Sequence, residues 1–215
     1  PVTEPPAPPA RAKAFPRTGV ALLRAGWARE DLAVGFKCGP SDVGHSHLDA
    51  NSWVLEAGGQ PLAIDTGWWS YATFIGFFDL KNHRWNWDCN ATVGHNSVLV
   101  DGQGQTWGGE YPGRLGALTS GPGWQMISGD ASRCYPGRLT RFIRTLCLLP
   151  PDRVIIRDVI ECVAPSHLEW LLHYAGAVRD AGAATIVEHQ GVTLAVTPFL
   201  PGDSRIPDHT IWTHN

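Results

Sequence analysis

The chain has 215 residues, and its 43% apolar and 17% charged composition is sufficient for one domain with a buried core. Its formal net charge of −3, without a long basic run, lacks the electrostatic pattern of a nucleic-acid-binding protein. No apolar stretch reaches the roughly 18 residues needed to cross a bilayer, and no basic-then-apolar signal peptide opens the chain. We therefore expect neither nucleic acid nor a membrane among its partners.

Residue usage is typical of a turn-rich β protein. The chain contains 10 Trp, 24 Gly and 17 Pro; Gly and Pro occupy turns, whereas aromatic rings pack on pleated sheets. Trp rings are also suited to stacking on sugar rings. The five cysteines are an odd number without C-x-x-C spacing. This favours small buried residues over a zinc ribbon or a full disulfide framework, although one bridged pair is compatible with the sequence.

Residues 1–17 are expected to form an extended linker, because they include six prolines and little apolar content that can pack. The only methionine is Met126, so the chain does not open at an initiator methionine, and we interpret it as part of a longer protein. The folded domain is expected to occupy residues 18–215. Its first strands are predicted at 20–24 and 32–37, joined by a polar turn.

Residues 44–55 combine two histidines and the carboxylate of Asp49 with the start of a strand. In an extended segment His45 and His47 would point to the same side, since side chains alternate with period two. Two imidazoles on one side suit metal binding, or a division of labour between proton transfer and ligation. A surface turn whose histidines cap backbone groups is the alternative interpretation.

A hairpin is expected next, with strands at 52–56 and 61–65 joined by the Gly-rich turn 57–60. Antiparallel pairing would return the end of the second strand toward the start of the first. The pattern therefore predicts that Asp65 lies close to His47.

Residues 66–94 hold eight aromatic residues with little regular period, which predicts a long loop with one helical turn; such loops are usually functional. A strand restarts at 94–103, with His95 at its beginning. Further strands are expected at 115–119, 124–128, 140–148, 153–162, 168–174, 184–189 and 192–198. Many short strands with short connections, and no internal repeat, predict an all-β fold, an antiparallel β-sandwich.

Three short runs share their order and spacing with one known family. They are Gly44-His45-Ser46-His47-Leu48-Asp49, Asp65-Thr66-Gly67 and His95-Asn96-Ser97-Val98-Leu99-Val100-Asp101-Gly102. With these runs the chain resembles the heparinase II/III-like family of polysaccharide lyases, which includes the oligoalginate lyases. The resemblance extends from about Phe15 through His173.

The resemblance implies a supersandwich-like domain that follows a helical toroid, with the active site in the cleft between the two. It also implies β-elimination on an acidic polysaccharide or oligosaccharide. In that reaction the proton α to a uronate carboxylate is removed and the glycosidic oxygen at C4 is expelled. The family's Tyr base lies on the toroid, so we expect the toroid of the parent chain as a partner and little activity from this domain alone. A periplasmic or secreted location is implied as well.

By position, the resemblance implies that His47, Asp65 and His95 bind a zinc ion and that His45 faces the substrate. Two imidazoles and one carboxylate are a suitable donor set for zinc. Tyr71 is the candidate for an additional tyrosine that some relatives carry between the metal-binding Asp and the second metal-binding His.

Removing a uronate α-proton requires groups that neutralise the carboxylate while negative charge develops. The sequence offers arginines at positions 138, 141 and 144 for bidentate pairing with that carboxylate, and Arg141 is our candidate. A solvated face of a sheet is the alternative explanation for these arginines.

Two other function classes compete with the lyase. The first is a carbohydrate-binding or scaffold sandwich without chemistry, in which the Trp-rich loop stacks on sugars and zinc fastens the loops. The second is a metal-dependent hydrolase, which is disfavoured because no carboxylate is spaced as in H-E-x-x-H proteins. The sequence of the parent upstream of Pro1 would discriminate between lyase and binding module.

Overall fold

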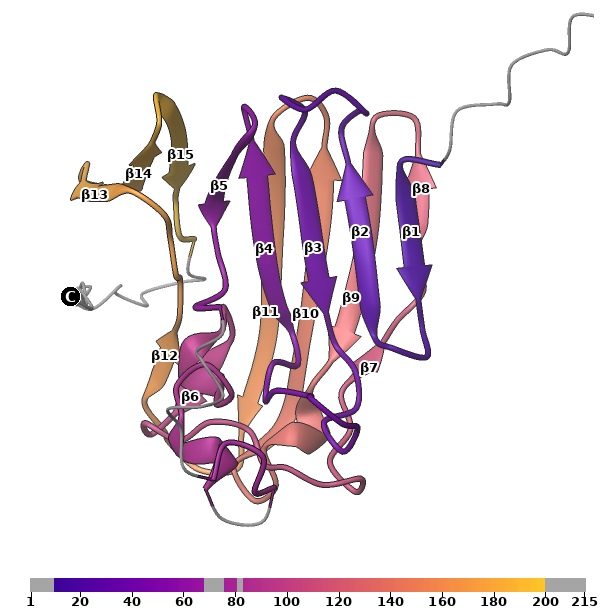
Figure 1. Cartoon of the computed structure of the whole chain (residues 1–215), viewed down its shortest axis with the longest axis vertical. Helices are drawn as coiled ribbons and strands as arrows, with labels where there is room; N and C mark the ends of the chain where they lie inside the picture. The colour runs from indigo at the N-terminus through magenta and orange to yellow at the C-terminus, as the bar shows by residue number, and fades with distance from the viewer. Residues whose placement is uncertain (1–9, 68–75, 81–82, 200–215) are drawn as a thin grey trace, which may run out of the picture.

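The computed structural model describes residues 10–67, 76–80 and 83–199. Its first sheet has five antiparallel strands in chain order: β1 (Ala12–Phe15), β2 (Val20–Arg24), β3 (Ala33–Lys37), β4 (Ser52–Ala57) and β5 (Gln60–Ala63). In Figure 1 this sheet lies in front of the second one.

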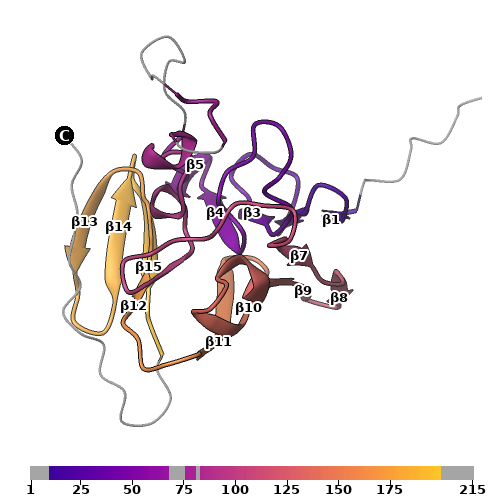
Figure 2. The same cartoon turned by 90° about the horizontal axis from the view of Figure 1, so that it is seen from below.

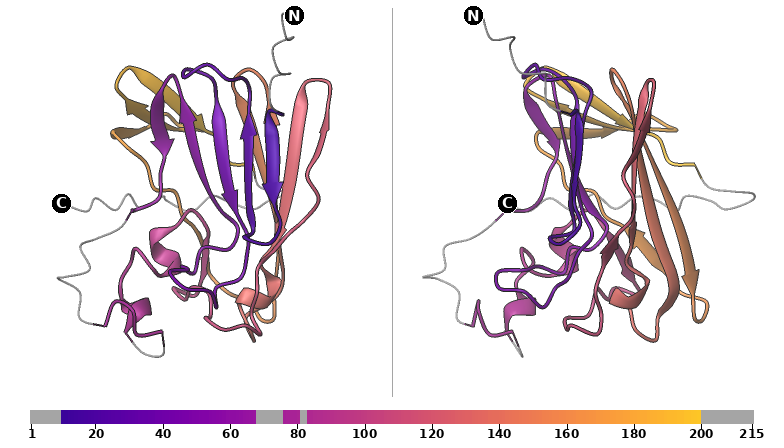
Figure 3. Two further views of the ribbon diagram at one scale, coloured as in Figure 1. Left: turned by 45° about the vertical axis from the view of Figure 1, so that its right-hand side comes forward. Right: turned by 90° about the vertical axis from the view of Figure 1, so that its right-hand side faces the viewer.

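The second sheet is also antiparallel and lies behind the first. Its strand order is β11 (Arg153–Cys162), β10 (Leu139–Leu149), β9 (Trp124–Asp130) and β7 (Arg114–Leu115), and β8 (Thr119–Gly121) also pairs with β9. Seen edge-on, the two sheets form two layers (Figure 3, right). The expected antiparallel β-sandwich is confirmed.

Two smaller sheets and three short 3-10 helices complete the described residues. β6 (Val98–Val100) pairs with β12 (Leu168–Trp170), and β13 (Ala177–Asp180), β14 (Thr185–His189) and β15 (Val192–Val196) form a three-stranded sheet. The 3-10 helices are η1 (Arg84–Asn86), η2 (Thr92–Gly94) and η3 (Ser132–Cys134). In the described part of the chain, no helix has the length and apolar character required to cross a membrane.

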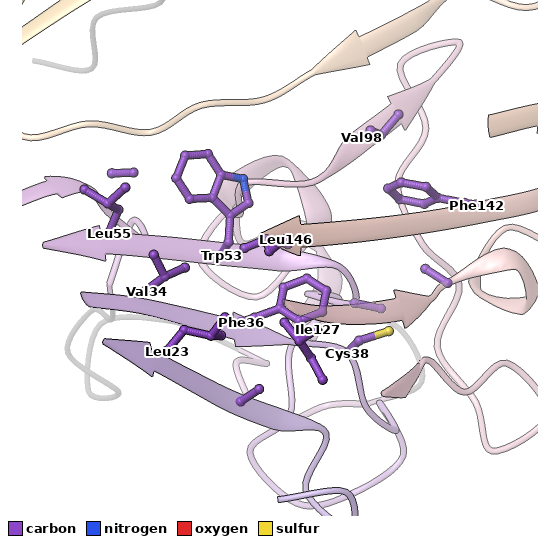
Figure 4. Close-up of a cluster of buried hydrophobic side chains, with 14 of the residues drawn as sticks. Leu23, Val34, Phe36, Cys38, Trp53, Leu55, Val98, Ile127, Phe142 and Leu146 are labelled. Atoms are coloured by element: carbon purple, nitrogen blue, oxygen red, sulfur yellow. The ribbon is translucent and has the colours of Figure 1, made fainter. Parts of the chain in front are cut away.

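The core lies between the two large sheets because alternate residues of each strand face inward. Leu23 and Phe36 from the first sheet meet Ile127, Phe142 and Leu146 from the second, and all five are buried. Figure 4 shows these side chains between the strands. Burying large apolar side chains stabilises the fold by about 1.5–3 kcal/mol each.

The hairpin formed by β4 and β5 matches the prediction closely. Ala57 pairs with Gln60, and the two turn residues Gly58 and Gly59 have φ values of 59° and 73°. Positive φ at both central positions is the property of a type I′ turn, which glycine adopts without steric cost.

Several elements differ from the prediction. The strands expected at 94–103 and 168–174 are limited to β6 and β12, and the strand expected at 115–119 is replaced by the two short strands β7 and β8. β1 lies inside the stretch expected to be a linker, because pairing with β2 satisfies its backbone groups and Pro16 stands just after the strand. β5 ends at Ala63, so Asp65 follows the strand instead of ending it. β13 was not predicted, and its pairing with β14 defines it.

The connections that carry the candidate residues gather at one end of the sandwich, the lower end in Figure 1. β3 runs into this end and β4 leaves it, so residues 38–51 form a loop there. Residues 83–97, with η1 and η2, lie at the same end, which Figure 2 shows from below. The topology thereby brings segments that are distant in sequence into one region.

Candidate functional site

His95 and Asp65 form the centre of the candidate site. Nδ1 of His95 lies 2.6 Å from Oδ2 of Asp65, and the His95 side chain is fully buried whereas that of Asp65 is 37% exposed. Burial, the largest single influence, would raise the pKa of the Asp65 carboxyl, but the hydrogen bonds from His95 and the Gly67 N–H, with the nearby imidazoles, together outweigh it, and the pKa lies below its ordinary value. Nε2 of His95 is buried and has no hydrogen-bond partner in the described residues.

Local backbone geometry explains why these two side chains meet. η2 ends at Gly94, where a Cβ atom would lie 2.2 Å from the Asp88 carbonyl oxygen, so glycine is required just before His95. The backbone N–H and the hydroxyl of Thr66 both donate to the Gly94 carbonyl, at 3.3 and 3.0 Å. These bonds hold the residues after β5 beside the residues that lead into β6.

His47 lies next to this pair. Its ring centroid is 5.2 Å from that of His95, and the residue is partly buried. Burial and the nearby His95 lower the pKa of His47 to about 4. At neutral pH His47 is therefore a neutral imidazole, the form that binds metal ions.

The donor set suits zinc, but a closed ligand shell is not formed. Within the described ranges, no three His, Cys, Asp or Glu side chains are grouped so that they could hold a metal ion. Asp65 Oδ2 and His95 Nδ1 are bonded to each other, so this carboxylate oxygen and this ring nitrogen are not free for a metal ion. The predicted neighbourhood of His47, Asp65 and His95 is thus present, whereas the predicted convergence on one metal position is not shown.

His45 occupies an exposed position in the same loop. It has φ = 61°, and its ring packs edge to face against Phe78 with centroids 5.3 Å apart. The expectation of an extended segment was wrong here, because the chain turns, with the Ser46 N–H donating to the Val43 carbonyl. His45 and His47 are thus placed by a turn, and not by strand alternation.

Arg84 is a contributor that sequence reasoning missed. Its side chain is buried, and its Nε and Nη2 donate to the Ser46 carbonyl at 3.2 and 2.6 Å. Its Nη1 donates to the Phe77 carbonyl at 3.0 Å. Arg84 therefore fixes the peptide between His45 and His47 against the 76–94 segment. Its position among aromatic residues is the only signal in the sequence.

Asn96 connects the segments around the site. Its Nδ2 donates to the carbonyls of Trp53 and Ile64, at 2.7 and 2.9 Å. Its Oδ1 accepts from the backbone N–H of His173 at 2.5 Å. Because Ile64 precedes Asp65 and Asn96 follows His95, this amide sets the distance between the two members of the pair.

Arg141 does not join this cluster. Alternation along β10 turns Phe142 inward and Arg141 outward, where its Nη1 lies 3.3 Å from Glu161 Oε1 in an exposed ion pair. This position agrees with the solvated-face alternative. Tyr71, the other candidate catalytic residue, lies outside the described residues.

The cysteines follow the simpler of the two expectations. All five are free; Cys38, Cys89 and Cys134 are buried, and Cys147 and Cys162 are partly buried. Burial raises the pKa of the Cys38 thiol to about 12, so it remains a protonated apolar residue of the core at neutral pH.

This domain is similar in sequence and fold to parts of known polysaccharide lyases. The chain is 24% identical over 176 residues to the exo-oligoalginate lyase of Saccharophagus degradans, a match that covers 75% of this chain and 23% of that enzyme. Its fold is similar to that of a heparinase III (TM-score 0.70, 17% identity) and to that of heparan sulfate lyase HepC from Pedobacter heparinus (TM-score 0.70, 18% identity). Each structural match covers 87% of this chain and 28% of the other, so the chain spans about a quarter of the length of these relatives.

The family assignment rests on nearly the full length of the sequence. The family described as heparinase II/III-like, C-terminal, matches residues 7–213. The chain therefore belongs to the heparinase II/III-like C-terminal domain family.

Proposed function

We propose that this domain is the β-sandwich part of a polysaccharide lyase that cleaves a uronic-acid-containing polysaccharide by β-elimination. The observation that carries the proposal is the pair formed by the buried His95 and the partly exposed Asp65 beside His47, at one end of a sandwich of this family. The helical toroid of the parent chain is part of the proposal, and so is a periplasmic or secreted location.

Zinc is the proposed cofactor, with His47, Asp65 and His95 as its ligands. The proposal is supported by the donor types, by the neutral state of His47 and by the buried Nε2 of His95. When bound, zinc would supply positive charge at this end of the domain and fasten the loops to one another. Binding would require Asp65 and His95 to exchange part of their mutual hydrogen bond for bonds to the metal.

His45 is the proposed substrate-facing residue. In β-elimination a base takes the proton α to the carboxylate, the electron pair of that C–H bond forms the new C=C bond, and the C4–O bond breaks as the leaving oxygen takes up a proton. The carboxylate must be stabilised while negative charge develops on it. His45 is exposed and two residues from His47, so its imidazole can donate a hydrogen bond to the uronate carboxylate. The base is assigned to the rest of the parent chain.

The proposal is tested by two measurements. The first is the zinc content of the 215-residue chain after reconstitution and dialysis, where one zinc per chain is expected. The second is the rise in ultraviolet absorbance from the unsaturated product when the full-length parent is given alginate or heparan sulfate. A parent that binds these polymers without cleaving them would instead support the carbohydrate-binding alternative, which the 42% exposure of Trp170 beside Trp53 favours.

A further inference from the structure

Arg144 is a buried cation in the middle of the sandwich. It lies on the inward face of β10 between Phe142 and Leu146, and its side chain is fully buried. Its Nε and Nη2 donate to the two carboxylate oxygens of Asp158 on β11, at 2.8 and 2.7 Å. Asp158 Oδ2 also accepts from the indole N–H of Trp170 at 3.1 Å. The charge of Arg144 is thus compensated within the second sheet and β12.

The remaining nitrogen of Arg144 reaches out of its own sheet. Nη1 donates to the carbonyl of Asn51 at 2.6 Å and to the carbonyl of Asn96 at 2.7 Å. Asn51 ends the loop that carries His47, and Asn96 directly follows His95. One guanidinium nitrogen therefore joins the two loops whose imidazole rings lie 5.2 Å apart.

Burying the Arg144–Asp158 ion pair costs desolvation free energy, so a contribution to stability does not by itself explain its presence in the core. A buried ion pair contributes little net stability compared with well-packed apolar residues, because both charges must be removed from water. The planar guanidinium, however, offers several donors in a fixed geometry, which the single ammonium of lysine cannot reproduce. Four bonds of this one side chain to three partners specify where the two loops stand relative to β10.

We propose that Arg144 is a positioning residue that fixes the His47 loop and the His95 loop relative to one another. The functional consequence of this inference rests on the proposed zinc site. Without the Arg144–Asp158 ion pair, the imidazoles of His47 and His95 would no longer be held next to one another. Removing a residue that holds metal ligands in position without binding the metal itself typically lowers metal affinity by about 10- to 100-fold.

The test is a zinc titration of the chain and of four variants. Arg144→Lys retains the positive charge but not the planar guanidinium with its several donors. The zinc dissociation constant of this variant should rise by about 10- to 100-fold. The double variant Arg144→Met with Asp158→Leu replaces the buried pair by apolar residues, which favours retention of the fold, and should show the same loss. The visible spectrum of cobalt(II) bound at the site should also differ from that of the wild-type chain in both variants. This spectrum reports on ligand geometry and not on stability.

Two matched controls lie on the same strand. Leu146→Ala removes a fully buried side chain that is not bonded to either loop; it should lower the melting temperature and leave zinc affinity unchanged. Arg141→Lys alters the exposed ion pair with Glu161 and should change neither quantity. If Leu146→Ala weakens zinc as much as Arg144→Lys does, the effect is general destabilisation and the inference is wrong.

Hydrogen exchange provides a readout that is independent of metal. In the metal-free chain, Arg144→Lys should accelerate amide exchange in peptides covering 45–51 and 92–97 relative to Leu146→Ala. If the wild-type chain binds no zinc but Arg144→Lys still accelerates exchange in both segments, the proposed cofactor is refuted and the positioning role stands. Unchanged exchange in both segments, with a folded Arg144→Lys variant, would overturn the inference.

Discussion

Nδ2 of Asn96 lies 2.9 Å from the carbonyl oxygen of Ile64, so the residue after His95 is tied to the residue before Asp65. The same amide group also donates to the Trp53 carbonyl at 2.7 Å. Both of its donors are therefore committed to holding backbone segments together inside the protein.

Replacing Asn96 by Asp should destabilise the domain strongly. The change removes both donors, places a carboxylate oxygen against two carbonyls and leaves buried acceptors unsatisfied, each at a cost of about 1–3 kcal/mol. We expect the free energy of unfolding, measured by urea denaturation, to fall by about 2–4 kcal/mol. The exposed Asn86, replaced by Asp in the same way, should shift it by less than about 0.5 kcal/mol. A small effect at Asn96 would mean that the amide is dispensable for holding the Asp65 segment.

His95→Ala should abolish zinc binding and also lower stability. The variant leaves Asp65 without its partner and opens a cavity where a fully buried ring stood. Zinc is expected to be absent after dialysis, and the urea midpoint should fall. His83→Ala is the matched control, because His83 is exposed and its Nδ1 pairs with the Oδ2 of Asp79 at 2.8 Å in an exposed ion pair. Retention of zinc by His95→Ala at wild-type stoichiometry would remove His95 from the ligand set.

His45→Ala should separate activity from stability in the full-length parent. His45 is exposed, so the melting temperature and zinc content should be unchanged. If its imidazole stabilises the developing charge, kcat should fall by about 100-fold or more on a uronate polymer. His167→Ala, another exposed histidine, should retain wild-type kcat. Equal rates for the two variants would exclude His45 from the reaction.

Stability should decline at alkaline pH partly because of Cys38. The pKa of the Cys38 thiol is about 12 in the folded chain and 9.0 ordinarily. Below pH 9 the thiol is therefore protonated in both the folded and the unfolded chain, and its contribution to the free energy of unfolding does not change with pH. Between these values only the unfolded chain loses the proton, and the free energy of unfolding should fall by about 1.4 kcal/mol per pH unit.

Urea unfolding at a series of pH values between 8 and 11 will test the Cys38 contribution. Cys38→Ala should show a shallower decline with pH than wild type, whatever its stability at pH 8. Leu146→Ala, which truncates a buried side chain that cannot ionise, serves as the comparison and should keep the wild-type slope. Parallel curves for Cys38→Ala and wild type would contradict the assignment.

The sequence by itself determined the sandwich and most of its strands. Alternation of apolar residues is a local property that indicates which side of a strand is buried, so the strands at 52–56 and 153–162 could be predicted, and the structure has them at Ser52–Ala57 and Arg153–Cys162. The Gly58-Gly59 turn set the β4–β5 hairpin in the same way, because its backbone conformation is encoded in two residues. The order of the three runs around His47, Asp65 and His95 was sufficient to indicate the family.

Tertiary structure decided which side chains meet. Three arginines lie on or next to β10. Only the packing of the two sheets against each other shows which of them is buried: Arg144 points inward and binds the loops, whereas Arg141 points to solvent. The turn at His45 depends on Arg84, 39 residues later in the chain, which binds the Ser46 carbonyl. Such contacts join segments that are far apart in sequence, and their energies depend on geometry across the fold, which no local pattern records.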